Sequence, residues 1–261
     1  MTSSSPLIIA IDGPSASGKG TIARKLAAQL GFAYLDTGLL YRAVGFGVVS
    51  AGGNPEDAEM AEEAALALAM QVSGGADLEV RPPAPVPRPR GAGESPVLSF
   101  GDMQESRIGL IDFHKLMADE VLRTDEAGVA ASKVAAIPEV RAALLKCQQD
   151  FCAMPPGGAK GAVLDGRDIG TVIAPDAAVK IFVTASAEAR AERRFKELQR
   201  RGVGATYEAV LADMKARDAR DAERAIAPTK PAADAVLLDT TTMNAEQALA
   251  ETVKIVESKI G

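Results

Sequence analysis

The sequence predicts an α/β protein in which helices cover a parallel β-sheet on both faces. Short apolar segments that suit buried strands alternate along the chain with longer segments that suit helices. The strand candidates are residues 7–12, 32–35, 161–164, 177–184 and 235–239. They are apolar almost throughout, which is typical of strands that are buried on both faces of a sheet.

The helix candidates carry apolar residues three and four positions apart, which is the spacing of one helix face. They are residues 19–30, 56–70, 126–136, 138–152, 186–199, 206–218 and 244–260. Gly31 stands where a C-cap glycine ends a helix, and Ser186 is placed to cap the helix that follows it. The inner face of the last helix is predicted to consist of Leu249, Val253, Val256 and Ile260.

Residues 74–160 do not fit the alternation of strands and helices, and we expect them to form a separate small lobe. The core would then consist of residues 1–73 and 161–261. Within the lobe, residues 81–96 contain so many prolines that a regular helix or a central strand is excluded. We therefore expect a proline-rich, extended insertion there.

Composition excludes several classes of protein. The formal net charge of −6 argues against a generally basic surface that grips nucleic acid. Two cysteines, Cys147 and Cys152, are too few for a disulfide framework, and His114 is the only histidine, so no Cys/His metal site is predicted. The first apolar run, Leu7–Ile11, is too short to be a signal peptide or to span a membrane. We expect a cytoplasmic monomer that binds neither nucleic acid nor a membrane.

A glycine-rich loop joins the first predicted strand to the first predicted helix. It consists of Gly13, Pro14, Ser15, Ala16, Ser17, Gly18, Lys19, Gly20 and Thr21. Small residues let backbone N–H groups turn inward around phosphate oxygens, and the start of the helix adds a favourable dipole. Lys19 can reach the β- and γ-phosphates of ATP, and the hydroxyl of Thr21, or that of Ser17, can bind Mg²⁺ or phosphate. The loop therefore predicts a P-loop NTPase-type core.

One position departs from the general phosphate-loop pattern, which has Ser or Thr directly after the lysine. Here that position is Gly20, and the hydroxyl comes one residue later, at Thr21. This ending resembles the loop of nucleoside monophosphate kinases, in which the same shift is usual.

Two further motifs follow predicted strands. Residues 36–42 (DTGLLYR) come after the second strand, and residues 165–171 (DGRDIGT) come after the third. The carboxyl ends of parallel strands meet at one edge of a sheet, where ligands bind. We therefore expect both motifs to face the same ligand as the phosphate loop.

Together with residues 131–136 (ASKVAA), 140–145 (VRAALL) and 215–228, these motifs resemble bacterial-type cytidylate kinase in content and order. The resemblance spans nearly the whole chain and departs from the family around residues 81–119. It implies ATP-dependent phosphorylation of CMP and dCMP with Mg²⁺. It also implies that residues 74–160 form the lobe that binds the nucleoside monophosphate, and that residues 186–228 form a helical lid.

The resemblance also implies roles for individual residues. The contacts to cytosine map to Ser132, Arg141 and Asp168, and the contacts to the monophosphate map to Arg42, Arg167 and Arg217. Asp221 and Arg224 would serve the ribose and the phosphates, and Thr37 would lie near the acceptor. Asp168 would accept a hydrogen bond from the exocyclic amino group of cytosine, which uracil lacks.

The arginines near the C-terminal third suggest how the phosphoryl group is stabilised. Arg217, Arg220 and Arg224 recur at spacings of three and four, so they share one face of a helix. A lid with guanidinium groups on that face could exclude water and neutralise charge on the transferred group. Lys19, Arg217 and Arg224 are the predicted catalytic residues.

Two other functions have to be weighed. A GTPase switch would need Asn/Thr-Lys-x-Asp to read guanine, but residues 229–232 end in Ala232, so that carboxylate is missing. A kinase of the same fold could act on another small acceptor, such as shikimate or AMP. The order of the motifs at 36–42, 131–136 and 165–171 favours cytidylate kinase over that alternative.

Overall fold

The computed structural model describes residues 5–74, 113–117, 119–223 and 226–260. The chain forms two compact units, residues 1–38 with 148–261, and residues 39–147. We call them the sheet unit and the helical unit. The second of these begins at Leu39 instead of residue 74, because the helices that follow Leu39 bury their apolar faces in its core.

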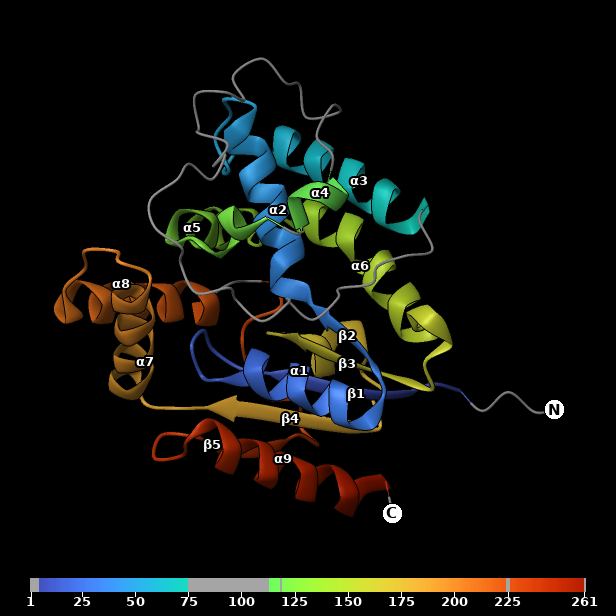
Figure 1. Ribbon diagram of the computed structural model, residues 1–261. Coiled ribbons are helices and arrows are strands. Elements are labelled where there is room, and N and C mark those ends of the chain that lie inside the picture. The colour runs from blue at the N-terminus through green and yellow to red at the C-terminus, as the bar shows by residue number, and fades with distance from the viewer. Residues whose placement is uncertain (1–4, 75–112, 118, 224–225, 261) are drawn as a thin grey trace, which may run out of the picture. The chain divides into compact units, whose positions relative to one another are not determined.

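The sheet unit contains five parallel strands in the order β2-β3-β1-β4-β5 (Figure 1). They are β1 (Leu7–Asp12), β2 (Ala33–Asp36), β3 (Gly161–Gly166), β4 (Val179–Thr184) and β5 (Val236–Asp239). All four pairings are parallel, so the carboxyl ends of the strands lie at one edge. The predicted α/β class and P-loop NTPase-type core are confirmed.

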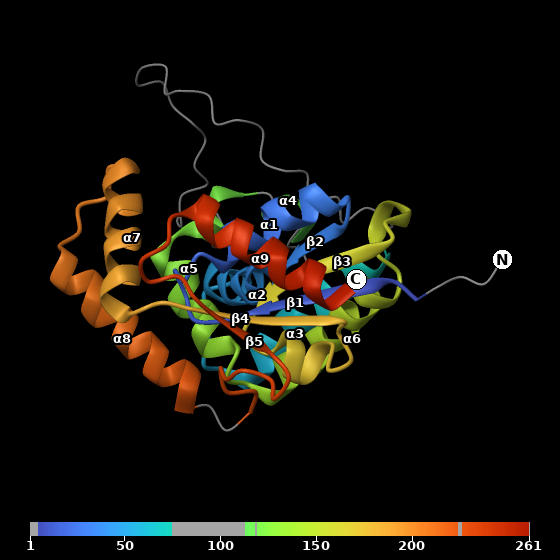
Figure 2. The same cartoon turned by 90° about the horizontal axis from the view of Figure 1, so that it is seen from below.

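Two helices pack side by side on one face of this sheet, α1 (Lys19–Leu30) and α9 (Ala245–Ile260) (Figure 2). Their buried side chains join those of the strands in one apolar core, which includes Ile9, Ile22, Leu26, Ile181 and Val256. Gly31 ends α1 in the left-handed conformation, as predicted.

The inner face predicted for α9 is confirmed except at its last residue. Val256 is buried, and Leu249 and Val253 are partly buried and pack against the apolar core, whereas Ile260 is 40% exposed. Ile260 is the last residue of α9, so the helix ends before its side chain can be covered.

The remaining helices of the sheet unit stand as a pair, α7 (Ala187–Arg200) and α8 (Tyr207–Glu223), which contact each other (Figure 1). Ser186 Oγ accepts a hydrogen bond from the N–H of Ala189 and so caps α7, as predicted. Ala191, Leu198 and Val210 form the buried contact between the two helices. Short turns at Pro156–Gly158 (3₁₀) and Ile169–Ile173 (π) flank β3.

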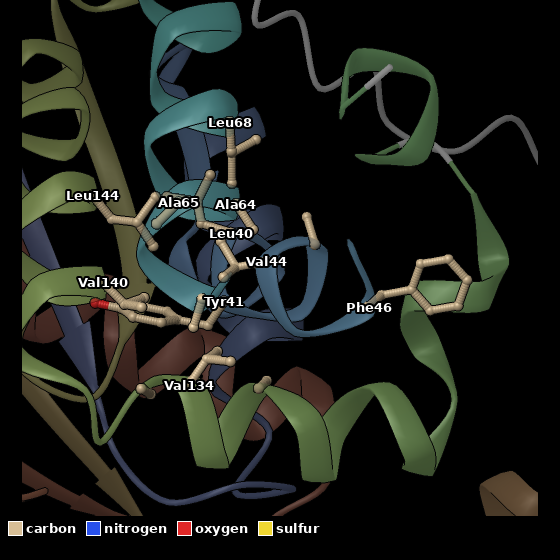
Figure 3. Close-up of a cluster of buried hydrophobic side chains, with 14 of the residues drawn as sticks. Leu40, Tyr41, Val44, Phe46, Ala64, Ala65, Leu68, Val134, Val140 and Leu144 are labelled. Atoms are coloured by element: carbon tan, nitrogen blue, oxygen red, sulfur yellow. The ribbon is translucent and has the colours of Figure 1, made fainter. Parts of the chain in front are cut away.

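The helical unit is built around α2 (Thr37–Ser50), whose first two residues still belong to the sheet unit. The other elements are α3 (Ala58–Gly74), α4 (Phe113–Met117), a 3₁₀ turn (Glu120–Arg123), α5 (Asp125–Val134) and α6 (Pro138–Ala153), which ends in the sheet unit. Figure 3 shows the apolar core between these helices, with Leu40, Val44, Leu68, Val140 and Leu144 among its members.

Some predictions lie outside the described residues, among them the whole proline-rich stretch 81–96 and Arg224. Cys147 is buried and Cys152 partly buried, and both are free thiols. Among the helices in the described part of the chain, none is long and apolar enough to cross a membrane.

Candidate functional site

The loop between β1 and α1 has the backbone conformation of a phosphate-binding loop. Gly13, Ala16 and Gly18 all have positive φ angles, of 148°, 57° and 92°. A side chain at Gly13 would collide with Val183 O, 2.0 Å from the position of a Cβ, so only glycine fits there. Successive turns of this kind point backbone N–H groups into one concavity. Because no acidic residue lies in the first turn of α1, the positive end of that helix is not neutralised from within.

Two arginines of α7 hold the backbone carbonyls of this loop. Arg190 donates to Ser15 O at 3.2 Å, and Arg193 donates to Ser17 O at 3.3 Å. Thr240, directly after β5, also donates its hydroxyl to Ser17 O at 2.9 Å. A loop that turns its N–H groups inward leaves its carbonyls to be satisfied elsewhere. These three side chains therefore support the shape of the phosphate loop.

Arg190 also ties the loop to α8. Its guanidinium group donates to both carboxylate oxygens of Asp218, at 3.0 and 2.5 Å, and its Nε donates to Ala185 O at 3.0 Å. The Arg190 side chain is 5% exposed and that of Asp218 is 29% exposed, so the arginine side of this two-bond pair is buried. One arginine thus connects the phosphate loop, the end of β4 and α8.

Lys19 lies against a carboxylate from the neighbouring motif. Its Nζ lies 3.6 Å from Asp165 Oδ1 and 3.4 Å from Pro14 O. Burial is the main cause that lowers the pKa of Lys19 to about 8, and the charge of Arg167 lowers it further. Burial likewise raises the pKa of Asp165 to about 6, which the attraction of Lys19 opposes. The pair brings the first and third strand ends into one charged cluster.

The same carboxylate explains why glycine follows Lys19. A Cβ at Gly20 would lie 2.8 Å from Asp165 Oδ2, so a serine or threonine at this position would collide with the carboxylate. Tyr34, on β2, donates its hydroxyl to Asp165 Oδ2 at 3.3 Å and holds it in place. The departure from the general phosphate-loop pattern is therefore a consequence of packing against β3.

The motif after β3 lies at the same edge as the phosphate loop, as predicted. Asp36 and Asp165 are paired in the register of β2 and β3, and the Thr37 hydroxyl donates to Asp165 O at 2.9 Å. Asp168 is 4% exposed and precedes the π-helical turn Ile169–Ile173. Asp12, at the end of β1, accepts hydrogen bonds from that turn. The ends of β1, β2 and β3 are thus interlinked.

Arg167 and α8 meet at one buried carboxylate. Arg167 Nε donates to Asp221 Oδ2 at 3.2 Å, and Arg217 Nε lies 4.0 Å from the same oxygen. Asp221 is 6% exposed, and both arginine side chains are largely covered. The structure therefore brings together three of the predicted substrate residues: Asp221 accepts a hydrogen bond from Arg167 and lies at ion-pair distance from Arg217. Arg224 cannot be placed with them because it lies outside the described residues.

Three predicted substrate residues belong to the helical unit. Arg42, on α2, donates to Leu122 O at 2.7 Å and to Thr124 O at 3.0 Å. Arg141, on α6, lies over the ring of Tyr41, 5.7 Å from its centroid, and Ser132 is buried on α5. Within this unit, Arg42 therefore braces the segment that leads into α5, the helix that carries Ser132.

Several residues at this site were not predicted to act there. Asp165 stands in the DGRDIGT motif, so its position after a strand was the available signal, but no role was assigned to it. Arg190 and Arg193 lie outside the sequence motifs named above, and no role is predicted for them. Their contacts with the loop depend on where α7 packs, which spacing along the chain does not reveal. Asp12 is predicted only as the last residue of the first strand.

The residues present fit the polyphosphate of a nucleotide. The loop offers inward N–H groups and Lys19, and Ser17 Oγ is buried without a hydrogen-bond partner in the part of the chain that is described. Such a buried hydroxyl in a phosphate loop fits a site that a ligand completes. The described residues contain no group of three or more His, Cys, Asp or Glu side chains that could hold a metal ion alone. A divalent cation would here have to share its ligands with phosphate oxygens, as Mg²⁺ commonly does.

Comparisons with known proteins agree with this geometry. A family model described as cytidylate kinase matches residues 9–80 and 105–258. A cytidylate kinase of Paramagnetospirillum magneticum is 52% identical over 97% of this chain and 98% of that protein. Cytidylate kinases of Rhodospirillum rubrum and Azorhizobium caulinodans are 51% and 48% identical, over 97% and 98% of this chain and 98% and 100% of those proteins.

Proposed function

This chain belongs to the cytidylate kinase family, and we propose that it transfers the γ-phosphoryl group of ATP to CMP and dCMP. The observation that carries the proposal is the phosphate loop with Lys19 at the carboxyl edge of the sheet, beside the motif that contains Arg167 and Asp168. The loop for the phosphate donor follows β1, and the residues that could hold a second nucleotide follow the neighbouring strand β3, so both lie at the same edge of the sheet.

We propose that the loop 13–21 binds the β- and γ-phosphates of ATP. Its N–H groups and the start of α1 would stabilise the negative charge, and Lys19 would add a positively charged ammonium group. Asp165 would hold Lys19 in place before the nucleotide arrives, since the two side chains already pair. The phosphates would then compete with Asp165 for the ammonium group, so Lys19 would need only a small displacement to reach them.

On the acceptor side, we propose that cytosine is read by Ser132, Arg141 and Asp168, and that Arg42, Arg167 and Arg217 hold the monophosphate. Asp221 supports this assignment because it accepts a hydrogen bond from Arg167 and lies at ion-pair distance from Arg217. Asp221 and Arg224 would contact the ribose and phosphates, and Thr37 would lie near the acceptor. In this assignment, residues of the helical unit would form part of the lobe that binds the monophosphate.

Phosphoryl transfer requires little covalent chemistry from a protein, since positioning and charge neutralisation supply most of the acceleration. Lys19, Arg217 and Arg224 would stabilise charge on the transferred group, and α7 and α8 would form the lid over ATP. Mg²⁺, when bound, would neutralise the phosphate oxygens. We propose that the Thr21 hydroxyl and the Asp165 carboxylate are the protein groups that would help to hold it.

The test is an assay of ADP release with ATP and Mg²⁺, in which CMP, dCMP, UMP, AMP, GMP and shikimate are offered in parallel. We expect strong turnover with CMP and dCMP only. Turnover with AMP or shikimate, but not with CMP, would contradict the proposed acceptor. The Lys19→Met variant, purified and assayed in the same way, serves as a control, because any ADP release that it shows at the wild-type level comes from a contaminating kinase.

A further inference from the structure

Asp12 is a buried carboxylate that joins the strand before the phosphate loop to the motif after β3. It is the last residue of β1 and is only 5% exposed. Its Oδ1 accepts a hydrogen bond from the N–H of Ile169 and its Oδ2 accepts one from the N–H of Gly170, both at 2.8 Å. Both carboxylate oxygens are thus directed at consecutive backbone N–H groups of another strand end.

These two N–H groups open the π-helical turn Ile169–Ile173, for which Asp168 is the N-cap residue. The side chain at an N-cap position commonly accepts hydrogen bonds from the first turn. Here the Asp168 side chain makes no such capping bond, and Asp12 supplies the acceptor oxygens in its place. Asp12 accepts the hydrogen bonds from the first N–H groups of the turn. The Asp168 carboxylate is therefore not needed as their cap and can be directed elsewhere.

The carbonyl group of Asp168 is held within the same turn. Its carbonyl oxygen accepts hydrogen bonds from the N–H of Val172 at 2.9 Å and from the hydroxyl of Thr171 at 3.4 Å. Since Asp12 also holds the next two residues, the backbone from Asp168 to the end of the turn is fixed by several hydrogen bonds. A carboxylate mounted on such a rigid turn can be held in one direction.

Keeping a carboxylate at Asp12 costs free energy. Burial raises its pKa to about 6, the hydrogen bonds from Gly170 and Ile169 oppose that rise, and the like charges of Asp168 and Asp165 add to it. The nearby Lys180 does not offset this charge directly, because its Nζ pairs with Asp234 at 2.8 Å while its aliphatic carbons lie beside Gly170. A costly buried charge that two N–H groups hold in place indicates a role that a neutral residue would not fill.

We propose that Asp12 is a positioning residue for nucleobase selection: it caps the turn 169–173 in place of Asp168 and so keeps the Asp168 carboxylate directed at the exocyclic amino group of the base. The proposal rests on the proposed function, in which Asp168 reads cytosine. It adds that selectivity is set partly by a residue of β1 that touches no substrate.

The experiment compares kcat and KM for CMP, UMP and ATP in the wild-type protein and in Asp12→Asn. Asparagine offers one acceptor oxygen and turns an NH₂ group toward the second N–H, so one capping bond is lost and a donor meets a donor. We expect the ratio of kcat/KM for CMP to that for UMP to fall roughly tenfold. The KM for CMP should rise, and the KM for ATP should stay within about twofold. A general loss of structure would instead change the kinetic constants for all three substrates by a similar factor.

A double-mutant cycle tests whether Asp12 acts through Asp168. In an Asp168→Asn background, the further change Asp12→Asn should lower the selectivity ratio by less than about twofold, because the group that it positions is already altered. Asp57→Asn is the matched control, since Asp57 Oδ1 also accepts from two consecutive backbone N–H groups, of Glu59 and Met60, but in the helical unit at an exposed site. Its selectivity ratio should equal that of the wild type.

The outcomes separate this proposal from the proposed function. A wild-type protein that does not phosphorylate CMP contradicts the proposed function itself. Wild-type activity on CMP with unchanged selectivity in Asp12→Asn, or fully additive effects in the cycle, overturns the role of Asp12. If circular dichroism shows that Asp12→Asn does not fold, Asp12→Ser, whose shorter side chain removes both capping bonds without introducing an opposed amide, replaces it. Hydrogen exchange on the nucleotide-free wild type is a further check: rapid exchange of the Ile169 and Gly170 amides would also overturn the proposal.

Discussion

The Nζ atom of Lys19 lies 3.6 Å from Oδ1 of Asp165, and the two side chains are 11% and 6% exposed. One residue belongs to the phosphate loop after β1, and the other belongs to the motif after β3. Their pairing means that the lysine of the donor site is positioned by the strand end that also carries Arg167 and Asp168. Four predictions follow from this cluster and from the contacts around it.

The first prediction concerns stability without nucleotide. The pKa of Asp165 is raised from 3.8 to about 6 in the folded protein, mainly by burial, so the folded state binds its proton more tightly than the unfolded state. This group therefore lowers stability progressively as pH rises from about 4 to about 6. Asp165→Asn should become more stable relative to the wild type over that window, as measured by thermal melts at pH 4, 5, 6 and 7. A stability difference that stays constant with pH would show that the carboxyl group titrates normally.

The second prediction is that Lys19→Met loses activity while retaining its fold. Removing a positive group that stabilises charge in the transition state typically costs a factor of roughly 10²–10³ in rate. We expect a loss of this size in kcat, with ADP release as the readout. Lys25→Met is the matched control, because Lys25 lies on the same helix and is exposed. Equal losses in the two variants would contradict the role of Lys19.

The third prediction explains the glycine after Lys19. Gly20→Ala should lower the melting temperature and raise the KM for ATP, because its Cβ would lie 2.8 Å from Asp165 Oδ2. In an Asp165→Ala background the same change should cost much less, since the colliding carboxylate is gone. Gly204→Ala serves as the control, because no atom lies within 4 Å of a Cβ at Gly204. If Gly20→Ala changes the melting temperature and the KM for ATP equally in both backgrounds, the collision with Asp165 is not the cause.

The fourth prediction concerns the support of the phosphate loop by α7. Arg193→Ala removes the donor to Ser17 O and the contacts with Thr240, so the loop should lose part of its fixed shape. We expect the KM for ATP to rise roughly tenfold and the KM for CMP to change little. Arg200→Ala, on the exposed end of the same helix, should leave both constants unchanged. A rise of both KM values in Arg193→Ala would point to a general loss of stability instead.

Local sequence was sufficient to predict most individual elements. The bounds of β1 and α1 agree with prediction residue for residue, because an apolar run, a glycine-rich loop, an amphipathic pattern and a C-cap glycine follow one another without ambiguity. The end of α8 was less accurate, since the helix continues to Glu223 beyond the predicted Asp218. The sequence has no proline or glycine between Asp218 and Pro228, so it contains no residue that marks where the helix ends.

The sequence by itself determined the α/β class, the phosphate loop and the motifs that resemble cytidylate kinase, because these depend on residues close together in the chain. Only the tertiary structure decided that Asp165 fills the space beside Gly20, that Arg190 and Arg193 hold the loop carbonyls, and that Asp12 caps the turn after Asp168. Each of these contacts joins residues from different strand ends or helices. Their partners are selected by strand order and helix packing, which local periodicity does not encode.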